Sequence, residues 1–176
     1  MMNRLSDGVS AEIPDWSREA KPFWVWDPGK SMLAALRSYQ RHRLRRNPVS
    51  AALRVWALLR HRWWSAVSGA DIPLTAEIGG GLILPHPNGV VVHSAARIGP
   101  NCIIFQQVTI AIQNYGVPVI GGHVDLGAGS KILGAVRIED HAVVGANAVV
   151  LKDVPRAATA VGIPARIIPW REGPVS

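Results

Sequence analysis

Apolar residues repeat every six positions between residues 120 and 151. An aliphatic residue opens each repeat, and a small or β-branched residue follows four positions later. A helix repeats near 3.6 residues and a strand at 2, so neither explains this period. Short strands joined by tight turns do explain it, because each aliphatic side chain then stacks on its counterpart one coil below. The aliphatic positions are Ile120, Leu126, Ile132, Ile138, Val144 and Val150.

The same period extends upstream with two interruptions. A run that starts at Ile72 restarts two residues out of step at Val92. Between Ile110 and Ile120 the spacing is ten instead of six, so four extra residues should bulge from one corner. The repeats suffice for roughly four triangular coils, at about three repeats per coil. We therefore expect a mainly β solenoid domain over residues 71–168.

Two helices are predicted upstream of the solenoid. Residues 31–46 carry apolar side chains at i, i+3 and i+4 spacing, with Ser31 as the N-cap. Residues 50–68 should form a second helix that Gly69 ends. The packing side of this second helix would carry Leu53, Trp56, Leu59 and Trp63 or Trp64. We expect the two helices to dock on the solenoid, or on each other across an oligomer.

The positive charge of the chain is confined to its N-terminal region. The net charge is +7 over 176 residues. Residues 1–70 hold 12 Lys+Arg and 5 Asp+Glu, whereas the solenoid and a C-terminal tail of residues 169–176 hold 7 of each. A solvated helix face and an anionic membrane surface both fit such a segment, which is also rich in Trp. No recognised nucleic-acid-binding motif accompanies the charge, so nucleic acid is not an expected partner.

Cysteine content and hydropathy indicate a cytoplasmic protein. The single cysteine, Cys102, excludes an intrachain disulfide, and its place in the column of small residues predicts a packing role. No apolar segment typical of a signal peptide follows the start of the sequence. The most apolar helical candidate, residues 50–70, is interrupted by Arg54, Arg60 and Arg62. We therefore expect a protein of the cytoplasm that works there or at the inner face of the membrane.

Of the six histidines, His86 is the best candidate for chemistry, because it lies between two prolines beside a glycine turn. An imidazole titrates near physiological pH and can act as a general base. The alternative for His86 is a hydrogen bond within the turn. His42 and His61 lie in the basic helices, where we expect them at the surface. His123 and His141 fall at solenoid turns, where a solvated side chain is expected.

Five segments follow one another in order between residues 71 and 168. They are Asp71-Ile72 with Ala76–Gly79, Leu84-Pro85-His86 with Gly89–Val91, Phe105–Thr109, Gly127–Gly134 and Val161–Arg166. In this order and spacing they resemble the serine acetyltransferase branch of the hexapeptide-repeat acyltransferases. The resemblance implies a left-handed parallel β-helix and homotrimers with active sites between neighbouring subunits. It also implies acetyl-CoA as the acyl donor, with no metal.

The resemblance assigns roles to individual residues. His86 matches a general base that takes the proton of an acceptor hydroxyl, and Asp71 matches the carboxylate that orients the imidazole. The expected acceptor contacts are Asn88, Gln106 and Tyr115. The expected acetyl-CoA contacts are Gly127, Ala128, Ser130, Lys131, Ala146, Lys152, Gly162 and Arg166, of which Lys152 and Arg166 would meet phosphates.

The residues expected to hold an amino acid depart from the family's pattern. Pro85 replaces an acidic residue before the base, Asn47 replaces an aspartate, and Gly116-Val117 replaces an Arg-His pair. Each charged partner lost from a desolvated pocket costs about 2–5 kcal/mol. The sequence therefore favours O-acetylation of a hydroxyl on a sugar or polysaccharide intermediate, as in the similar exopolysaccharide and colanic acid enzymes. The alternatives are an L-serine O-acetyltransferase that makes O-acetylserine for cysteine biosynthesis, and a non-catalytic trimeric scaffold.

Overall fold

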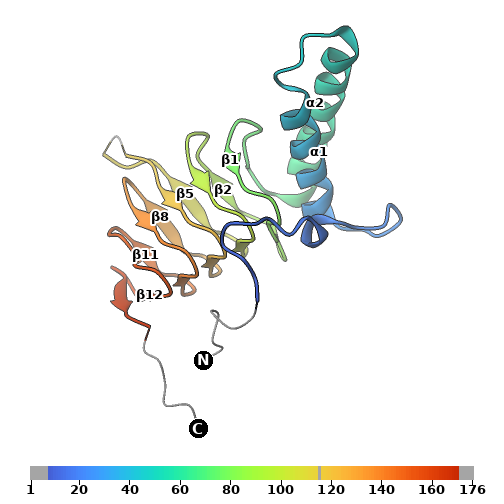
Figure 1. Ribbon diagram of the computed structural model, residues 1–176. Helices are drawn as coiled ribbons and strands as arrows, with labels where there is room; N and C mark the ends of the chain where they lie inside the picture. The colour runs from blue at the N-terminus through green and yellow to red at the C-terminus, as the bar shows by residue number, and fades with distance from the viewer. Residues whose placement is uncertain (1–7, 115, 171–176) are drawn as a thin grey trace.

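The structure, a computed structural model, describes residues 8–114 and 116–170. The six-residue repeats form short strands that stack into three sheets around a solenoid (Figure 1). The first sheet contains β1 (Glu77–Ile78), β3 (Arg97–Ile98), β6 (Val119–Ile120) and β9 (Arg137–Ile138). The second contains β4 (Ile103–Ile104), β7 (Asp125–Leu126), β10 (Val143–Val144), β12 (Thr159–Val161) and β13 (Arg166–Ile168). The third contains β2 (Val91–Val92), β5 (Thr109–Ala111), β8 (Lys131–Leu133) and β11 (Val149–Val150).

The strands pair in parallel along each sheet, and β13 turns back antiparallel to β12. The aliphatic residue of each repeat points inward, as the period predicts. Ile104, Leu126 and Ile132 are fully buried in one continuous core. Burying such a side chain stabilises the fold by about 1.5–3 kcal/mol. Cys102 is buried as well, with its Sγ 3.2 Å from the carbonyl oxygen of Gly121, which confirms its packing role.

The two interruptions of the period appear as longer coils. Arg97 pairs with Glu77 twenty residues earlier and with Val119 twenty-two residues later, whereas Val119 pairs with Arg137 after eighteen. The extra residues fall at the corner between β5 and β6. There two hydrogen bonds of 3.0 and 3.1 Å join the backbones of Gln113 and Gly116. The predicted bulge is therefore confirmed.

The helices are α1 (Pro28–His42) and α2 (Pro48–Ser68). Each begins earlier than predicted, because an Asx-Pro pair supplies the N-cap and a proline inside the first turn. The Asp27 carboxylate accepts from the Lys30 N–H at 2.8 Å, and the Asn47 side chain accepts from the Ser50 N–H at 2.7 Å. The helix α1 also ends four residues before the predicted Arg46. The helix α2 ends as predicted, at Gly69 in the left-handed conformation.

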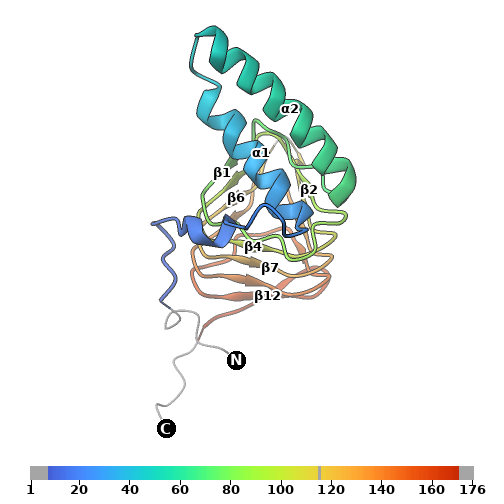
Figure 2. The ribbon, with the colours of Figure 1, turned by 90° about the vertical axis from the view of Figure 1, so that its right-hand side faces the viewer.

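The two helices pack together across one end of the solenoid (Figure 2). The side chains of Met32, Leu33 and Leu36 in α1 are fully buried in the same core as the first coil, which would otherwise expose its apolar end. Docking on the solenoid is thus confirmed, and the two helices also pack on each other within one chain. Among the described residues, no helix combines the length and the apolar character needed to cross a bilayer.

The packing side predicted for α2 is wrong. The buried positions are Ser50, Ala57, His61 and Ser68. Small side chains occupy most of this face because α2 packs closely against α1. Leu53, Trp56, Leu59 and Trp63 point outward and are 37, 59, 56 and 66% exposed, while Trp64 packs partly against the core.

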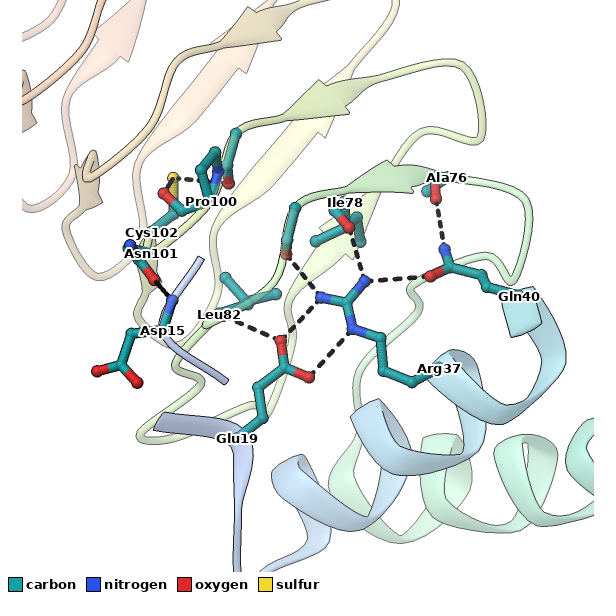
Figure 3. Close-up of polar contacts among 12 residues, drawn as sticks. Asp15, Glu19, Arg37, Gln40, Ala76, Ile78, Leu82, Pro100, Asn101 and Cys102 are labelled. Atoms are coloured by element: carbon teal, nitrogen blue, oxygen red, sulfur yellow. Dashed lines mark hydrogen bonds and ion pairs between the residues drawn. The ribbon is translucent and has the colours of Figure 1, made fainter. Parts of the chain in front are cut away.

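A short 3₁₀ helix, η1 (Trp16–Glu19), ties the N-terminal arm to α1 and β1. Arg37 of α1 pairs with Glu19 at 2.8 Å and donates to the carbonyl oxygens of Ile78 and Gly79, both at 2.6 Å (Figure 3). The same guanidinium lies 5.3 Å from the centre of the Trp16 ring. One cation thus joins three elements that are distant in sequence.

Buried Asn101 fixes the arm to the next coil of the solenoid. Its Oδ1 accepts from the Asp15 N–H at 2.8 Å (Figure 3), and its Nδ2 donates to the carbonyl oxygens of Ser10 and Ile13. All the hydrogen-bonding groups of this amide are therefore in use, which accounts for a buried asparagine at a corner. The arm is ordered by these contacts, although its sequence carries no periodicity.

Candidate active site

One corner of the solenoid, between the second and third sheets, carries most of the predicted site residues. The corner turns of successive coils are joined by backbone hydrogen bonds. These bonds run from Gly89 N to Gly69 O, Gln107 N to Asn88 O, Gly129 N to Gln106 O, and Asn147 N to Ala128 O, at 2.7, 2.9, 2.8 and 2.8 Å. Residues predicted to contact the acceptor and the acyl donor therefore lie along one line down the solenoid.

His86 lies at the end of this line nearest the helices. It is exposed in the turn before β2, between Pro85 and Pro87, and the Val90 N–H closes the turn on the Pro87 carbonyl oxygen at 3.1 Å. Two prolines restrict the backbone on either side of the imidazole. The ring is therefore presented to the outside on a stiff support.

Asp71 lies at the same end of the solenoid, at the start of the third sheet. Its backbone pairs with β2: the Asp71 N–H donates to Val90 O at 2.8 Å and its carbonyl oxygen accepts from Val92 N at 2.9 Å. The carboxylate is exposed. Within the described residues no hydrogen bond joins it to the His86 ring. His86 and Asp71 lie at the same end of the solenoid, and we call this end the rim.

The predicted acceptor residues occupy the upper corner turns. Asn88 packs on the C-cap of α2, where a Cβ added to Gly69 would lie 2.5 Å from the Asn88 Nδ2. Gln106 lies one coil below, and its Oε1 is buried with no hydrogen-bond partner among the described residues. Orphaned buried acceptors are rare in proteins and mark places where a ligand donor could bind. Tyr115 falls outside the described residues.

The packing of the coils explains glycine within the glycine-rich run of the predicted acetyl-CoA site. A Cβ at Gly127 would lie 2.6 Å from the backbone nitrogen of Ala146 in the next coil. Close stacking of the coils therefore accounts for Gly127, and it brings Gly127, Ala128 and Ala146 together. Ser130 is fully buried, so its hydroxyl is turned into the solenoid. Gly162, in contrast, has φ +97°, and an added Cβ would meet only the Pro164 carbonyl oxygen, at an ordinary contact distance of 3.7 Å.

The three predicted cations differ in availability. Lys131 is engaged, because its Nζ donates to the carbonyl oxygen of Gln107 at 2.8 Å and lies 3.1 Å from Thr109 Oγ1. Lys152 and Arg166 are exposed near the last coil and form no ion pair with a described residue. They are free to meet an anionic group. Small side chains along the corner and two exposed cations near the last coil fit an elongated ligand that ends in phosphates, such as CoA.

Sequence reasoning placed His61 at the surface, which is wrong. This histidine of α2 is buried, and its Nε2 has no hydrogen-bond partner among the described residues. Burial lowers the pKa of the ring, while the backbone of Ile72 and the charge of Asp71 act in the opposite direction. His61 thus lies behind the carboxylate of the site. The spacing of the buried residues Ala57, His61 and Ser68 was the signal that could have found it.

The surface positions expected for His123 and His141 are also wrong. Both rings are buried at another corner, with their Nδ1 atoms 2.9 Å apart and their planes nearly perpendicular. Both residues have positive φ, so the corner backbone turns their side chains onto the neighbouring coil. One ring must donate and the other accept. The pair therefore packs inside the fold and takes no part in the rim that carries His86.

A groove lies elsewhere on the molecule. A volume of about 560 Å³ lies between the end of α1 and the first sheet, bordered by residues such as Arg43, Glu77 and Arg97. None of the predicted site residues lines it. The rim around His86 is the better candidate site, because it carries the predicted base and carboxylate and this groove carries neither. The described residues hold no cluster of three or more His, Cys, Asp or Glu side chains that could bind a metal ion.

Comparison with known proteins assigns the chain to a family. No family model matches it. The serine acetyltransferase of Synechococcus elongatus is 38% identical over 111 residues, which cover 61% of this chain and 45% of that protein. A solved serine acetyltransferase in complex with CoA superposes with a TM-score of 0.68 at 33% identity, over 82% of this chain and 58% of that one. The chain spans about half the length of the curated relatives it matches.

A second solved structure covers the relative more completely. Soybean serine acetyltransferase complexed with serine is 35% identical with a TM-score of 0.60, over 81% of this chain and 70% of that chain. The chain belongs to the serine acetyltransferase-like family of hexapeptide-repeat acyltransferases.

Proposed function

We propose that the protein is an acetyl-CoA-dependent O-acetyltransferase whose acceptor is L-serine. The main support is the similarity of 81 to 82% of the chain, at 33 to 35% identity, to serine acetyltransferases solved with CoA and with serine. The curated relatives that match the chain are likewise named serine acetyltransferase. They favour serine over the sugar acceptor that the sequence departures suggest, and they lend no support to a role in polysaccharide biosynthesis.

In this proposal His86 takes the proton of the acceptor hydroxyl as its oxygen attacks the thioester carbonyl of acetyl-CoA. A new C–O bond forms, the C–S bond breaks, and the proton passes from the imidazolium to the departing thiolate. Asp71 stabilises that imidazolium and orients the ring. Both side chains are exposed on one rim in a single chain, so closing the site requires another surface. A homotrimer with its sites between neighbouring subunits would supply it.

The donor would lie along the corner below His86. Its acetyl thioester belongs near the imidazole, at the end where Asn88 and Gln106 lie. Its phosphates belong at the other end, where the cations Lys152 and Arg166 are unpaired among the described residues. The unpartnered Oε1 of Gln106 can accept a hydrogen bond from an amide or hydroxyl of a bound ligand.

A sugar hydroxyl remains a second candidate acceptor because of one structural observation. At Gly116, where serine acetyltransferases carry an arginine, an added Cβ would lie only 2.3 Å from the Cβ of Ala135. The short turn therefore lies flat against the next coil and leaves no room for a larger side chain. A charge that could hold the carboxylate of an amino acid is missing at this point.

The test is thiol release from acetyl-CoA, measured with L-serine and with a panel of sugars. We expect turnover with L-serine that falls at least a hundredfold in His86→Ala and Asp71→Asn. The matched control is His93→Ala, a histidine on the third-sheet side of the same coil that has no assigned role. Turnover with a sugar and none with L-serine would show that the acceptor is the sugar hydroxyl, the second candidate. Thiol release that survives His86→Ala would contradict both acceptors and the role of His86.

A further inference from the structure

The outer face of the helical region is apolar and strongly exposed. Along α2, Trp56 and Trp63 lie seven residues apart on one side of the helix, with Leu53 and Leu59 beside them. The exposed segment 23–26 lies beside this face, because the Trp26 ring meets the ring of Trp64, the neighbour of Trp63 in α2, edge to face with 5.5 Å between ring centres. We call these residues the aromatic face: Phe23, Trp24, Trp26, Leu53, Trp56, Leu59 and Trp63, which are 89, 74, 74, 37, 59, 56 and 66% exposed.

The same helices carry only positive charge. Residues 28–70 contain nine Lys and Arg and no Asp or Glu. Arg37 is used inside the fold, and Arg54 donates to carbonyl oxygens of the loop between the helices. Lys30 donates to the Ala20 carbonyl oxygen at the base of the arm. The remaining cations of this region are Arg41, Arg43, Arg45, Arg46, Arg60 and Arg62.

Arg62 directly precedes Trp63 in α2, and Arg60 lies three residues before Trp63, about one helical turn away. Long arginine side chains can lay their stems along apolar surface and reach outward with the charge. Indole rings prefer the boundary between water and hydrocarbon, because one edge is polar and the body is apolar. A face of this composition matches a layer in which hydrocarbon lies beneath acidic headgroups.

Other occupants fit less well. In a symmetric contact between two copies the same patch meets itself, so unpaired arginines would face one another with no carboxylate of residues 28–70 between them. A nucleic acid would satisfy the charge but offers no apolar phase for Leu53 and Leu59. The aromatic face combines apolar side chains with neighbouring positive charge, and neither of these occupants accommodates both.

We propose that the aromatic face, together with Arg60 and Arg62, is a peripheral docking surface for membranes with acidic headgroups. The helices lie at one end of the solenoid, and β12 lies toward the other (Figure 2). The coil that carries His86 is the one nearest the helices. Docking would therefore hold this rim close to the membrane and leave the last coil on the far side. The proposal is independent of the acceptor.

Co-sedimentation of the full chain with vesicles tests the proposal. We expect binding to vesicles of equal parts phosphatidylglycerol and phosphatidylcholine, with a blue shift of tryptophan emission, and little binding to phosphatidylcholine alone. Added salt should weaken the binding. Failure of the unmodified protein to bind the acidic vesicles overturns the proposal.

Two double variants separate charge from apolar contact. Arg60→Gln with Arg62→Gln should weaken vesicle binding at least tenfold, whereas the control Arg97→Gln with Arg137→Gln, exposed arginines of the first sheet, should leave it unchanged. Trp56→Ser with Trp63→Ser should also weaken it tenfold, unlike Ile112→Ser with Leu151→Ser. Equal effects of variant and control would contradict the proposal.

Light scattering and thermal unfolding of each variant complete the test. All four double variants replace exposed residues, apart from the partly exposed Arg60, and should keep the melting temperature of the parent. If Trp56→Ser with Trp63→Ser instead lowers the number of subunits, the face is a contact between copies and the membrane proposal is wrong. Tighter binding to an RNA duplex than to acidic vesicles would assign the face to nucleic acid and overturn it likewise.

Discussion

His61 shows how a single buried side chain can set the environment of the rim. Its ring lies between α2 and the start of the solenoid, where the charge of Asp71 and the backbone of Ile72 act on its pKa. Its Nε2 is buried without a partner among the described residues. The fold therefore favours a neutral ring at this position.

A dependence of stability on pH follows from this burial. The folded pKa of His61 lies below the ordinary value of 6.5. Below pH 6.5 the unfolded chain binds a proton that the folded chain does not, so the free energy of unfolding falls as the pH drops, until the folded pKa is passed. His61→Gln should remove this part of the slope. Denaturant unfolding on either side of pH 6.5 measures it.

His42 of α1 is the control for that measurement. It is partly exposed and has one long contact of 3.4 Å with the Ser50 hydroxyl. His42→Gln should therefore keep the slope of the parent. A pH slope that is the same in the parent and in His61→Gln would show that His61 is protonated equally in both states.

At the scale of elements, the arm, α1 and the first coil depend on one ion pair. The side chains of Arg37 and Glu19 are only 13 and 9% exposed, and Glu19 also accepts from the Leu82 N–H at 3.1 Å. The strong acceptors around the guanidinium come from two other segments, Glu19 of the arm and the carbonyl oxygens of Ile78 and Gly79 in the first coil. Such a cluster replaces the apolar contacts that the short arm cannot provide.

Removing one partner leaves a buried charge. Arg37→Met should lower the free energy of unfolding by about 3–5 kcal/mol, because Glu19 and two carbonyl oxygens lose their donor. The matched control is Arg97→Met, which breaks a 2.9 Å pair with Glu77 whose side chains are 66 and 62% exposed. That loss should be about 0–1 kcal/mol. Urea unfolding of the two variants checks the difference, and equal losses would contradict the role of Arg37.

At the scale of the whole molecule, the rim of His86 and Asp71 is open in one chain. If neighbouring subunits close it, activity must follow assembly. Light scattering should then give three times the 19.0 kDa mass of the chain, and the specific activity should fall when dilution separates the subunits. A monomer with full thiol release would show that the rim works without a partner.

The six-residue period by itself determined the solenoid, the inward positions and the corner bulge. This was possible because each coil buries the same column of side chains, so the pattern is local and repeats. The two Asx-Pro pairs also mark where the helices start, although the apolar spacing alone predicts both starts two or three residues too late. Order and spacing of the motif segments sufficed to indicate the family.

Only the tertiary structure decided which side chains of the helices and corners are buried. His61, His123 and His141 occupy polar-looking positions, but neighbouring coils and α1 cover them. Conversely, Trp56 and Trp63 follow a helical stripe that predicts packing, yet no described element covers them. Burial at these positions depends on contacts between segments distant in sequence. A local pattern cannot specify which of those segments will cover a given side chain. The line of turns below His86 arises in the same way, from coil stacking.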